Sequence, residues 1–141
     1  MKMYQDIATL ILRLALASGF LSAVASRLNW WGKQSSGWNH FLTYTAQVNS
    51  FAPQELIAPL AVTSTILETA LGILLLAGFK TSYAAFGASA LSFLFALAMS
   101  YSYGIKEPLD YSVFAFSAAA LLLASMQHYR WSLDELLNTN Y

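Results

Sequence analysis

The chain of 141 residues contains no cysteine. It therefore cannot form a disulfide, ligate zinc or an iron–sulfur cluster through cysteine, or attack a substrate with a thiol. The sequence also lacks a phosphate-binding loop, a nucleotide fingerprint, a nucleophile motif and ligands at metal-binding spacing. These absences indicate that the chain brings no catalyst and no intrinsic cofactor of its own.

Charge is also scarce. Charged residues make up 10% of the chain, against about 25% in ordinary soluble domains. Seven basic and seven acidic residues cancel, so there is no basic field that would attract nucleic acid. Hydrophobic residues make up 57% of the chain. A soluble protein of this size would need more charge to cover its surface, and the composition therefore favours an integral membrane protein.

Four apolar segments meet or approach the length of about 20 residues that a helix needs to cross the hydrocarbon. They are residues 7–28, 56–79, 83–103 and 109–126. None shows the alternating pattern of a membrane β-strand. A soluble bundle is disfavoured because helices that are apolar all round leave no face for water. The expected fold is all-α, an integral membrane four-helix bundle that forms a single domain over residues 1–141.

The connection between the first two spans has its own periodicity. Trp38, Phe41, Leu42, Thr45 and Val48 recur at spacings of three and four residues. This pattern predicts a short amphipathic helix. The helix would either cap the bundle or lie on the membrane surface.

Two charges fall well inside the expected spans, Arg13 and Glu68, whereas Arg27 and Asp110 lie at the ends of their spans. Charges at membrane depth face the bundle interior and find a partner. At 1.5 Å per residue, Arg13 is expected roughly 9 Å and Glu68 roughly 14 Å from the same membrane face. We therefore expect an Arg13–Glu68 ion pair between antiparallel neighbours. The pair would either fix the helix register or, with Thr65 on the same side of the second span, line a path for a ligand or proton.

The remaining polar residues are less informative. His40 and His128 are expected on opposite sides of the membrane, where they cannot share a metal, so no metal site is expected. Even crossings put both chain ends on one side. Each side then carries three basic residues, and the positive-inside rule gives no orientation.

Several motifs occur in an order that resembles the DoxX/DoxD family of small four-helix membrane proteins. They are Arg-Leu-Ala-Leu-Ala-Ser-Gly-Phe at 13–20, Ser-Arg-Leu at 26–28, Glu-Thr-Ala-Leu-Gly at 68–72 with Gly-Phe-Lys at 78–80, and Arg-Trp-Ser-Leu-Asp at 130–134. The family usually has Lys near the position of Arg27, so the match is not complete there. The resemblance extends over nearly the whole chain.

The resemblance implies a multi-pass protein of the cell (inner) membrane with cytoplasmic termini. Some relatives are described as the small subunit of a thiosulfate:quinone oxidoreductase, and others are linked with oxidative-stress membrane complexes. Arg13 and Glu68 match the family's intramembrane polar positions, whereas no catalytic residue can be carried over. The favoured interpretation is the membrane subunit or anchor of a respiratory or redox-stress complex that contacts quinone.

The alternative is a non-catalytic scaffold or assembly factor that binds membrane or redox proteins, or further copies of itself, within the bilayer. A transporter is a weaker third hypothesis, because the chain shows neither a repeat nor broken helices. A quinone site needs an apolar slot with a few hydrogen-bond donors, and the candidate residues are Arg13, Glu68, Thr65, Trp38 and Tyr101. A cavity that touches Arg13 and Glu68 would favour a ligand, and a sealed pair would favour the scaffold.

Overall fold

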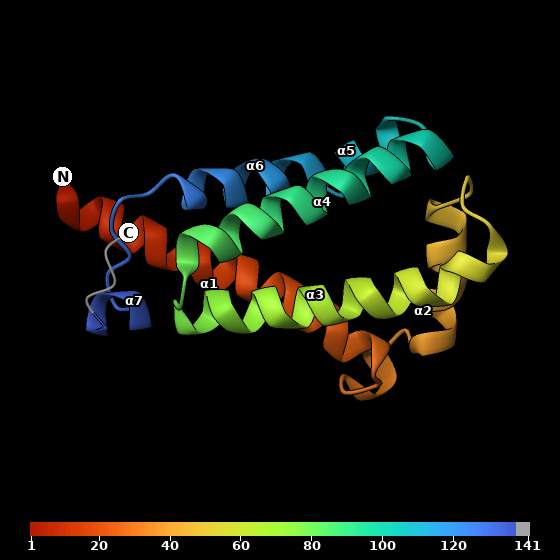
Figure 1. Ribbon diagram of the computed structural model, residues 1–141, viewed down its shortest axis with the longest axis horizontal. Helices are drawn as coiled ribbons and strands as arrows, with labels where there is room; N and C mark the ends of the chain where they lie inside the picture. The colour runs from red at the N-terminus through yellow and green to blue at the C-terminus, as the bar shows by residue number, and fades with distance from the viewer. Residues whose placement is uncertain (138–141) are drawn as a thin grey trace.

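The computed structural model describes residues 1–137, and the regular structure in this range is entirely helical. The elements are α1 (Lys2–Arg27), η1 (Gly32–Gln34), α2 (Trp38–Val48), η2 (Gln54–Leu56), α3 (Ile57–Ala77), α4 (Thr81–Tyr103), α5 (Lys106–Asp110), α6 (Val113–Ala124) and α7 (Leu133–Leu136). Three long apolar helices and one shorter one form a bundle of the membrane type (Figure 1). The all-α membrane bundle expected from the sequence is confirmed.

The long helices α1, α3 and α4 are apolar and long enough to cross a membrane. The fourth apolar helix, α6, has 12 residues and reaches about 18 Å at 1.5 Å per residue. The segment expected to be the fourth span, 109–126, is divided because Ser112 adopts a left-handed conformation with φ 57°. That residue ends the turn after α5 and precedes α6, so the fourth apolar helix is shorter than its apolar run suggested.

The helices form two layers. α1 packs on α3, and α4 packs on α6. In Figure 1 the α4–α6 layer lies above the α1–α3 layer, with the N-terminus and α7 at one end and α2 at the other. The shared core is Leu16, Ala17, Phe20, Leu75, Ala84, Ala85, Ala88, Ala120, Leu123 and Tyr129. Since Tyr129 and the start of α4 belong to this core, the layers are fused at the end that carries the N-terminus and α7.

Small residues let each pair of helices approach closely. In the α4–α6 pair, the hydroxyl of Ser89 donates to the carbonyl of Ser117 and the hydroxyl of Ser117 donates to the carbonyl of Ser89, both at 2.8 Å. In the α1–α3 pair, a Cβ added to Gly72 would stand 2.8 Å from Leu21. These small residues therefore hold helices of the same chain together.

The amphipathic helix expected between the first two spans is confirmed as α2. Thr45 and Val48 are its buried residues, and it contacts α3 and α4. The hydroxyl of Ser102 near the end of α4 donates to the carbonyl of Val48. The helix therefore lies across the end of the bundle opposite the termini and caps it.

Candidate functional site

A cavity of about 800 Å³ lies between the two layers, on the side of the bundle that α2 caps. Its position follows from the arrangement of α3 and α4. Leu71 and Gly87, which are equidistant from the turn at Phe79, are in contact, because a Cβ on Gly87 would stand 3.1 Å from Leu71. Further from the turn, the opposed residues Ser64 and Leu94 line the cavity instead.

The cavity wall is mostly apolar and aromatic, with a few polar side chains. The aromatic residues are Phe20, Phe41, Tyr44, Phe95, Tyr111 and Phe116. The charged and hydrogen-bonding residues are Ser26, Arg27, Ser36, His40, Thr45, Asn49, Ser64, Glu68 and Ser92. This combination is typical of a small-molecule site, in which apolar walls bind and a few polar groups orient the ligand.

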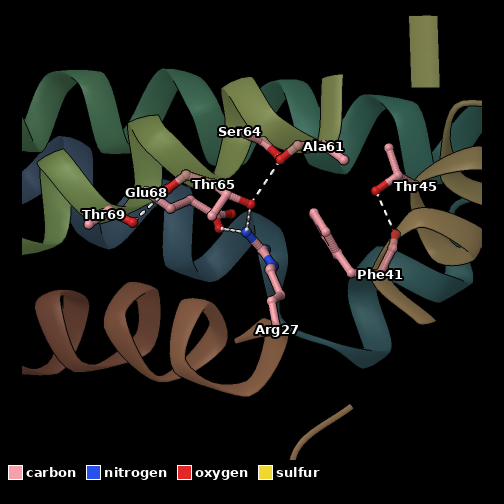
Figure 2. Close-up of polar contacts among 8 residues, drawn as sticks. All are labelled: Arg27, Phe41, Thr45, Ala61, Ser64, Thr65, Glu68 and Thr69. Carbon is pink, nitrogen blue, oxygen red and sulfur yellow. Dashed lines mark hydrogen bonds and ion pairs between the residues drawn. The ribbon is translucent and has the colours of Figure 1, made fainter. Parts of the chain in front are cut away.

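The charged centre of the cavity is an ion pair between Nη1 of Arg27 and Oε2 of Glu68. The two side chains are only 10% and 17% exposed. Figure 2 shows that Nη1 of Arg27 also donates to the hydroxyl of Thr65, at 3.0 Å. The Thr65 hydroxyl in turn donates to the carbonyl of Ala61, at 2.8 Å. The side chains of α3 thus fix the head of an arginine that comes from the last residue of α1.

The amphipathic helix α2 holds the same arginine from another direction. The central carbon of the Arg27 guanidinium lies 3.7 Å from the centre of the Phe41 ring. This is cation–π geometry. The ring of Trp38 lies 5.7 Å from that of Phe41. Arg27 therefore connects α1, α2 and α3. A movement of α2 would displace the Arg27 guanidinium and so alter its ion pair with Glu68.

The predicted Arg13–Glu68 ion pair is wrong, because Glu68 pairs with Arg27. Gly72 of α3 lies against Leu21 of α1, and Gly78 lies against Arg13. This register puts Glu68 level with about residue 24 of α1, which is about 16 Å from Arg13 at 1.5 Å per residue. The prediction sets the start of α1 level with the end of α3, whereas Gly78 at the end of α3 lies against Arg13, about three turns into α1.

Arg13 has a different role at the end of the bundle that carries the termini. Its side chain is buried, and Nη2 donates to the carbonyl of Trp131 at 2.8 Å. The carboxylate of Asp134 lies close enough to act on its charge. Asp134 accepts from the backbone N–H groups of Lys80 at 2.7 Å and Thr81 at 2.8 Å. Arg13 therefore belongs to the contact between the C-terminal segment and the α3–α4 turn, not to the cavity.

The other candidate residues, Thr65, Trp38 and Tyr101, lie in different places relative to the cavity. Thr65 belongs to the ion-pair cluster through Arg27. Trp38 lies behind Phe41 and does not itself line the cavity. Tyr101 is 74% exposed and packs edge-on against Phe51 at 5.3 Å, outside the cavity.

Arg27 is the functional candidate that the sequence reasoning did not select. Its place at the end of the first apolar segment indicates a basic residue at the membrane surface. The sequence did carry a signal, because Arg13, Leu16, Phe20, Val24 and Arg27 recur at spacings of three and four residues, and all are buried. That spacing places both arginines on the interior face of α1.

Tyr44 of α2 lines the cavity, and its ring lies 6.3 Å from that of Phe95. Burial raises the pKa of the Tyr44 hydroxyl above its usual value, and the nearby Tyr103, Tyr111 and Glu107 add to this effect. Tyr44 is therefore protonated at neutral pH, and its hydroxyl can donate a hydrogen bond.

The arrangement suits an uncharged ligand with a compact polar group. The ion pair carries no net charge, and the guanidinium has five N–H donors, of which those on Nη1 serve Glu68 and Thr65. Within residues 1–137, no cluster of three His, Asp or Glu side chains could hold a metal. The chemistry that the site offers is hydrogen bonding in apolar surroundings.

Comparison with known proteins gives one match. The model of the DoxX family matches residues 8–101. The matched region extends from the second turn of α1 into the last turn of α4, and it contains Arg13, Arg27 and Glu68. No curated protein and no solved structure matches the chain.

Proposed function

Because this chain belongs to the DoxX family of membrane proteins, we propose that it is the membrane subunit or anchor of a respiratory or redox-stress complex and that its cavity binds quinone. The observation that carries the proposal is the Arg27–Glu68 ion pair in the wall of an aromatic-lined cavity. Charged groups at membrane depth are costly and rare, and they mark substrate or ion pathways, proton relays and ligand counter-ions.

The cavity has suitable size and chemistry for this ligand. Its volume of about 800 Å³ lies within the range of about 300–1,000 Å³ typical of small-molecule sites. A quinone ring stacks well on aromatic side chains, and Phe41 and Tyr44 lie in the wall. The two carbonyl oxygens of a quinone are hydrogen-bond acceptors, and Arg27 and the protonated Tyr44 are donors.

In this proposal the residues of the chain bind and orient the quinone. Arg27 donates to a carbonyl oxygen, Glu68 balances the charge of Arg27, and Thr65 and Phe41 hold the guanidinium in place. Reduction of a quinone to a quinol takes up two electrons and two protons. The electrons come from a partner protein that carries the redox centre, because the sequence has no cysteine and residues 1–137 contain no cluster of three His, Asp or Glu side chains that could hold a metal.

The proposal places the protein in the cell (inner) membrane with both termini in the cytoplasm. The N-terminus and α7 lie at the same end of the bundle, which supports a shared side for the two ends. The orientation with respect to the cytoplasm rests on the resemblance to the family.

Quinone binding can be tested by filling the cavity. Ala98 lines the cavity, whereas Ala70 of α3 is exposed outside it. We expect Ala98→Phe to abolish the retention of quinone, because the ring occupies the space of the ligand, and Ala70→Phe to leave it unchanged. Mass spectrometry of quinones bound to each variant after purification in mild detergent measures the effect.

A second comparison addresses the ion pair. Arg27→Lys keeps the charge but loses the planar fork of donors, and it should weaken quinone binding, whereas Arg130→Lys at an exposed ion pair should not. Equal quinone retention in wild type and Ala98→Phe would overturn the proposal. A native preparation that holds a constant protein partner and no quinone would favour the scaffold instead.

A further inference from the structure

The cavity is not equally closed on its different sides. Near the turn that joins α3 and α4, Leu71 of α3 contacts Gly87 of α4. In Figure 1 the two ribbons start together at this turn and separate toward α2. The cavity-lining residues Leu60 of α3 and Leu94 of α4 are 40% and 63% exposed. Leucines that line a cavity and also face the outside of a membrane bundle form a mouth that opens to lipid.

The opposite side, between α1 and α6, is narrowed by an aromatic ring. Phe116 lies against Gly19, because a Cβ there would stand 3.1 Å from the ring. Phe116 also packs edge-on against Phe20 at 5.2 Å. The side toward the loops is covered by α2, whose Tyr44 packs on Phe95. Ser36 and His40 form a polar rim there, and both are exposed.

We propose that the site takes a membrane-dissolved amphiphile with a compact polar head and an apolar tail, and that it enters sideways from the bilayer between α3 and α4. The head then reaches Arg27 and Glu68, and the tail lies in the mouth between Leu60 and Leu94. A water-soluble ligand would instead enter by way of Ser36 and His40. This inference rests on the proposed function in its choice of site, and it adds the route and the requirement for a tail.

The position of the tail can be mapped directly. Two probes with the same tail and a photoreactive diazirine at its end are needed, one with a quinone head and one with a phospholipid head. They are added to the full chain in lipid nanodiscs, irradiated, and located by mass spectrometry of peptides. We expect the quinone probe to label α3 near Leu60 and α4 near Leu94. Labels near Ser36 and His40, or near Gly19, would overturn the lateral route.

The two probes separate this inference from the proposed function. If the phospholipid probe labels the mouth and the quinone probe does not, the lateral route stands and the quinone assignment fails. If quinone is retained but its tail labels the rim at Ser36 and His40, the quinone assignment stands and the lateral route fails. If neither probe labels the cavity, the lateral route is overturned.

The mouth can also be narrowed without touching the ion pair. Leu94→Phe enlarges a residue of the mouth, and Leu97→Phe makes the same change at an exposed position of α4 that does not line the cavity. A narrower mouth slows both entry and release, so we expect quinone release from Leu94→Phe to be about tenfold slower, whereas release from Leu97→Phe should match that of the wild type. Recovery of intrinsic tryptophan fluorescence measures release. An unchanged release rate in Leu94→Phe would contradict a route through this mouth.

Discussion

The two buried arginines have different roles although they lie on the same face of one helix. Arg13 and Arg27 both lie on the interior face of α1. Arg27 meets Glu68 at the cavity, whereas Arg13 holds the carbonyl of Trp131 at the other end of the bundle. Each charge is satisfied within its own cluster, and the two clusters should therefore be energetically independent.

A double-mutant cycle tests this independence. Arg27→Met and Glu68→Gln should each lower the free energy of unfolding, by about 3–5 kcal/mol, because each leaves a buried partner uncompensated. The double variant should lose much less than the sum. Arg13→Met combined with Glu68→Gln should be additive to within about 0.5 kcal/mol. Denaturant unfolding in detergent measures all five variants, and strong coupling between Arg13 and Glu68 would contradict the register of α1 and α3.

At the scale of residues, the sequence predicts which polar residues are buried more readily than it predicts which partners they contact. The charges of Arg13 and Glu68 stand out against apolar runs, and both prove to lie in the interior of the bundle. Their partners depend on the register of α1 against α3, and Arg13 and Arg27 are separated by about four turns. Apolar composition does not determine this register, because the first turns of α1, which include Lys2 and Asp6, extend beyond the end of α3.

At the scale of elements, the local sequence pattern predicts most of the helices but not the break before α6. The apolar runs predict α1, α3 and α4, and the spacing of Phe41, Thr45 and Val48 predicts α2. The break before α6 depends on the left-handed conformation of Ser112, which is uncommon for residues other than glycine. No apolar count can reveal such a conformation, so the fourth helix is shorter than predicted.

The C-terminal segment provides a prediction at the scale of elements. Asp134 accepts two backbone hydrogen bonds at the start of α4, and Asp134→Asn removes the charge from this interaction. Hydrogen bonds to charged groups contribute about 1.5–3 kcal/mol, and we expect a loss of that order in the free energy of unfolding. Asp110, in an exposed pair with Lys106, supplies the matched control Asp110→Asn, which should cost less than about 1 kcal/mol. Equal effects of the two substitutions would show that the segment does not stabilise the bundle.

The whole molecule is a bundle of two layers that are fused at one end and separated by a cavity at the other. The fused end carries the N-terminus and α7, and the other end carries α2 (Figure 1). This arrangement follows from the placement of small residues, since Ala84, Ala85 and Ala88 bring the layers together near the turn. Four crossings by helices α1, α3, α4 and α6 would put Lys2 and Glu135 on the same side of the membrane.

The absence of cysteine from the sequence makes the crossings easy to test. Single variants Lys2→Cys, Glu135→Cys and Lys33→Cys carry one thiol each at an exposed position. With a maleimide that cannot cross membranes, Lys2→Cys and Glu135→Cys should react from one side of sealed vesicles, and Lys33→Cys from the other. Reaction of Lys2→Cys and Glu135→Cys from opposite sides would show that α6 does not complete a fourth crossing.

The shortness of α6 has a consequence for the lipid around the protein. A helix of 12 residues covers about 18 Å, whereas the hydrocarbon of a typical bilayer is about 30 Å thick. The apolar surface around the molecule is therefore uneven in height, because α1 and α3 are long enough to cross the hydrocarbon and α6 is not. Hydrophobic mismatch costs a fraction of a kcal/mol per Å, so the leaflets next to α6 must thin, and lipids with shorter acyl chains should gather there. Two copies that pack with α6 facing α6 would share one thinned patch of membrane. The thickness of the bilayer would then affect how strongly the two copies associate.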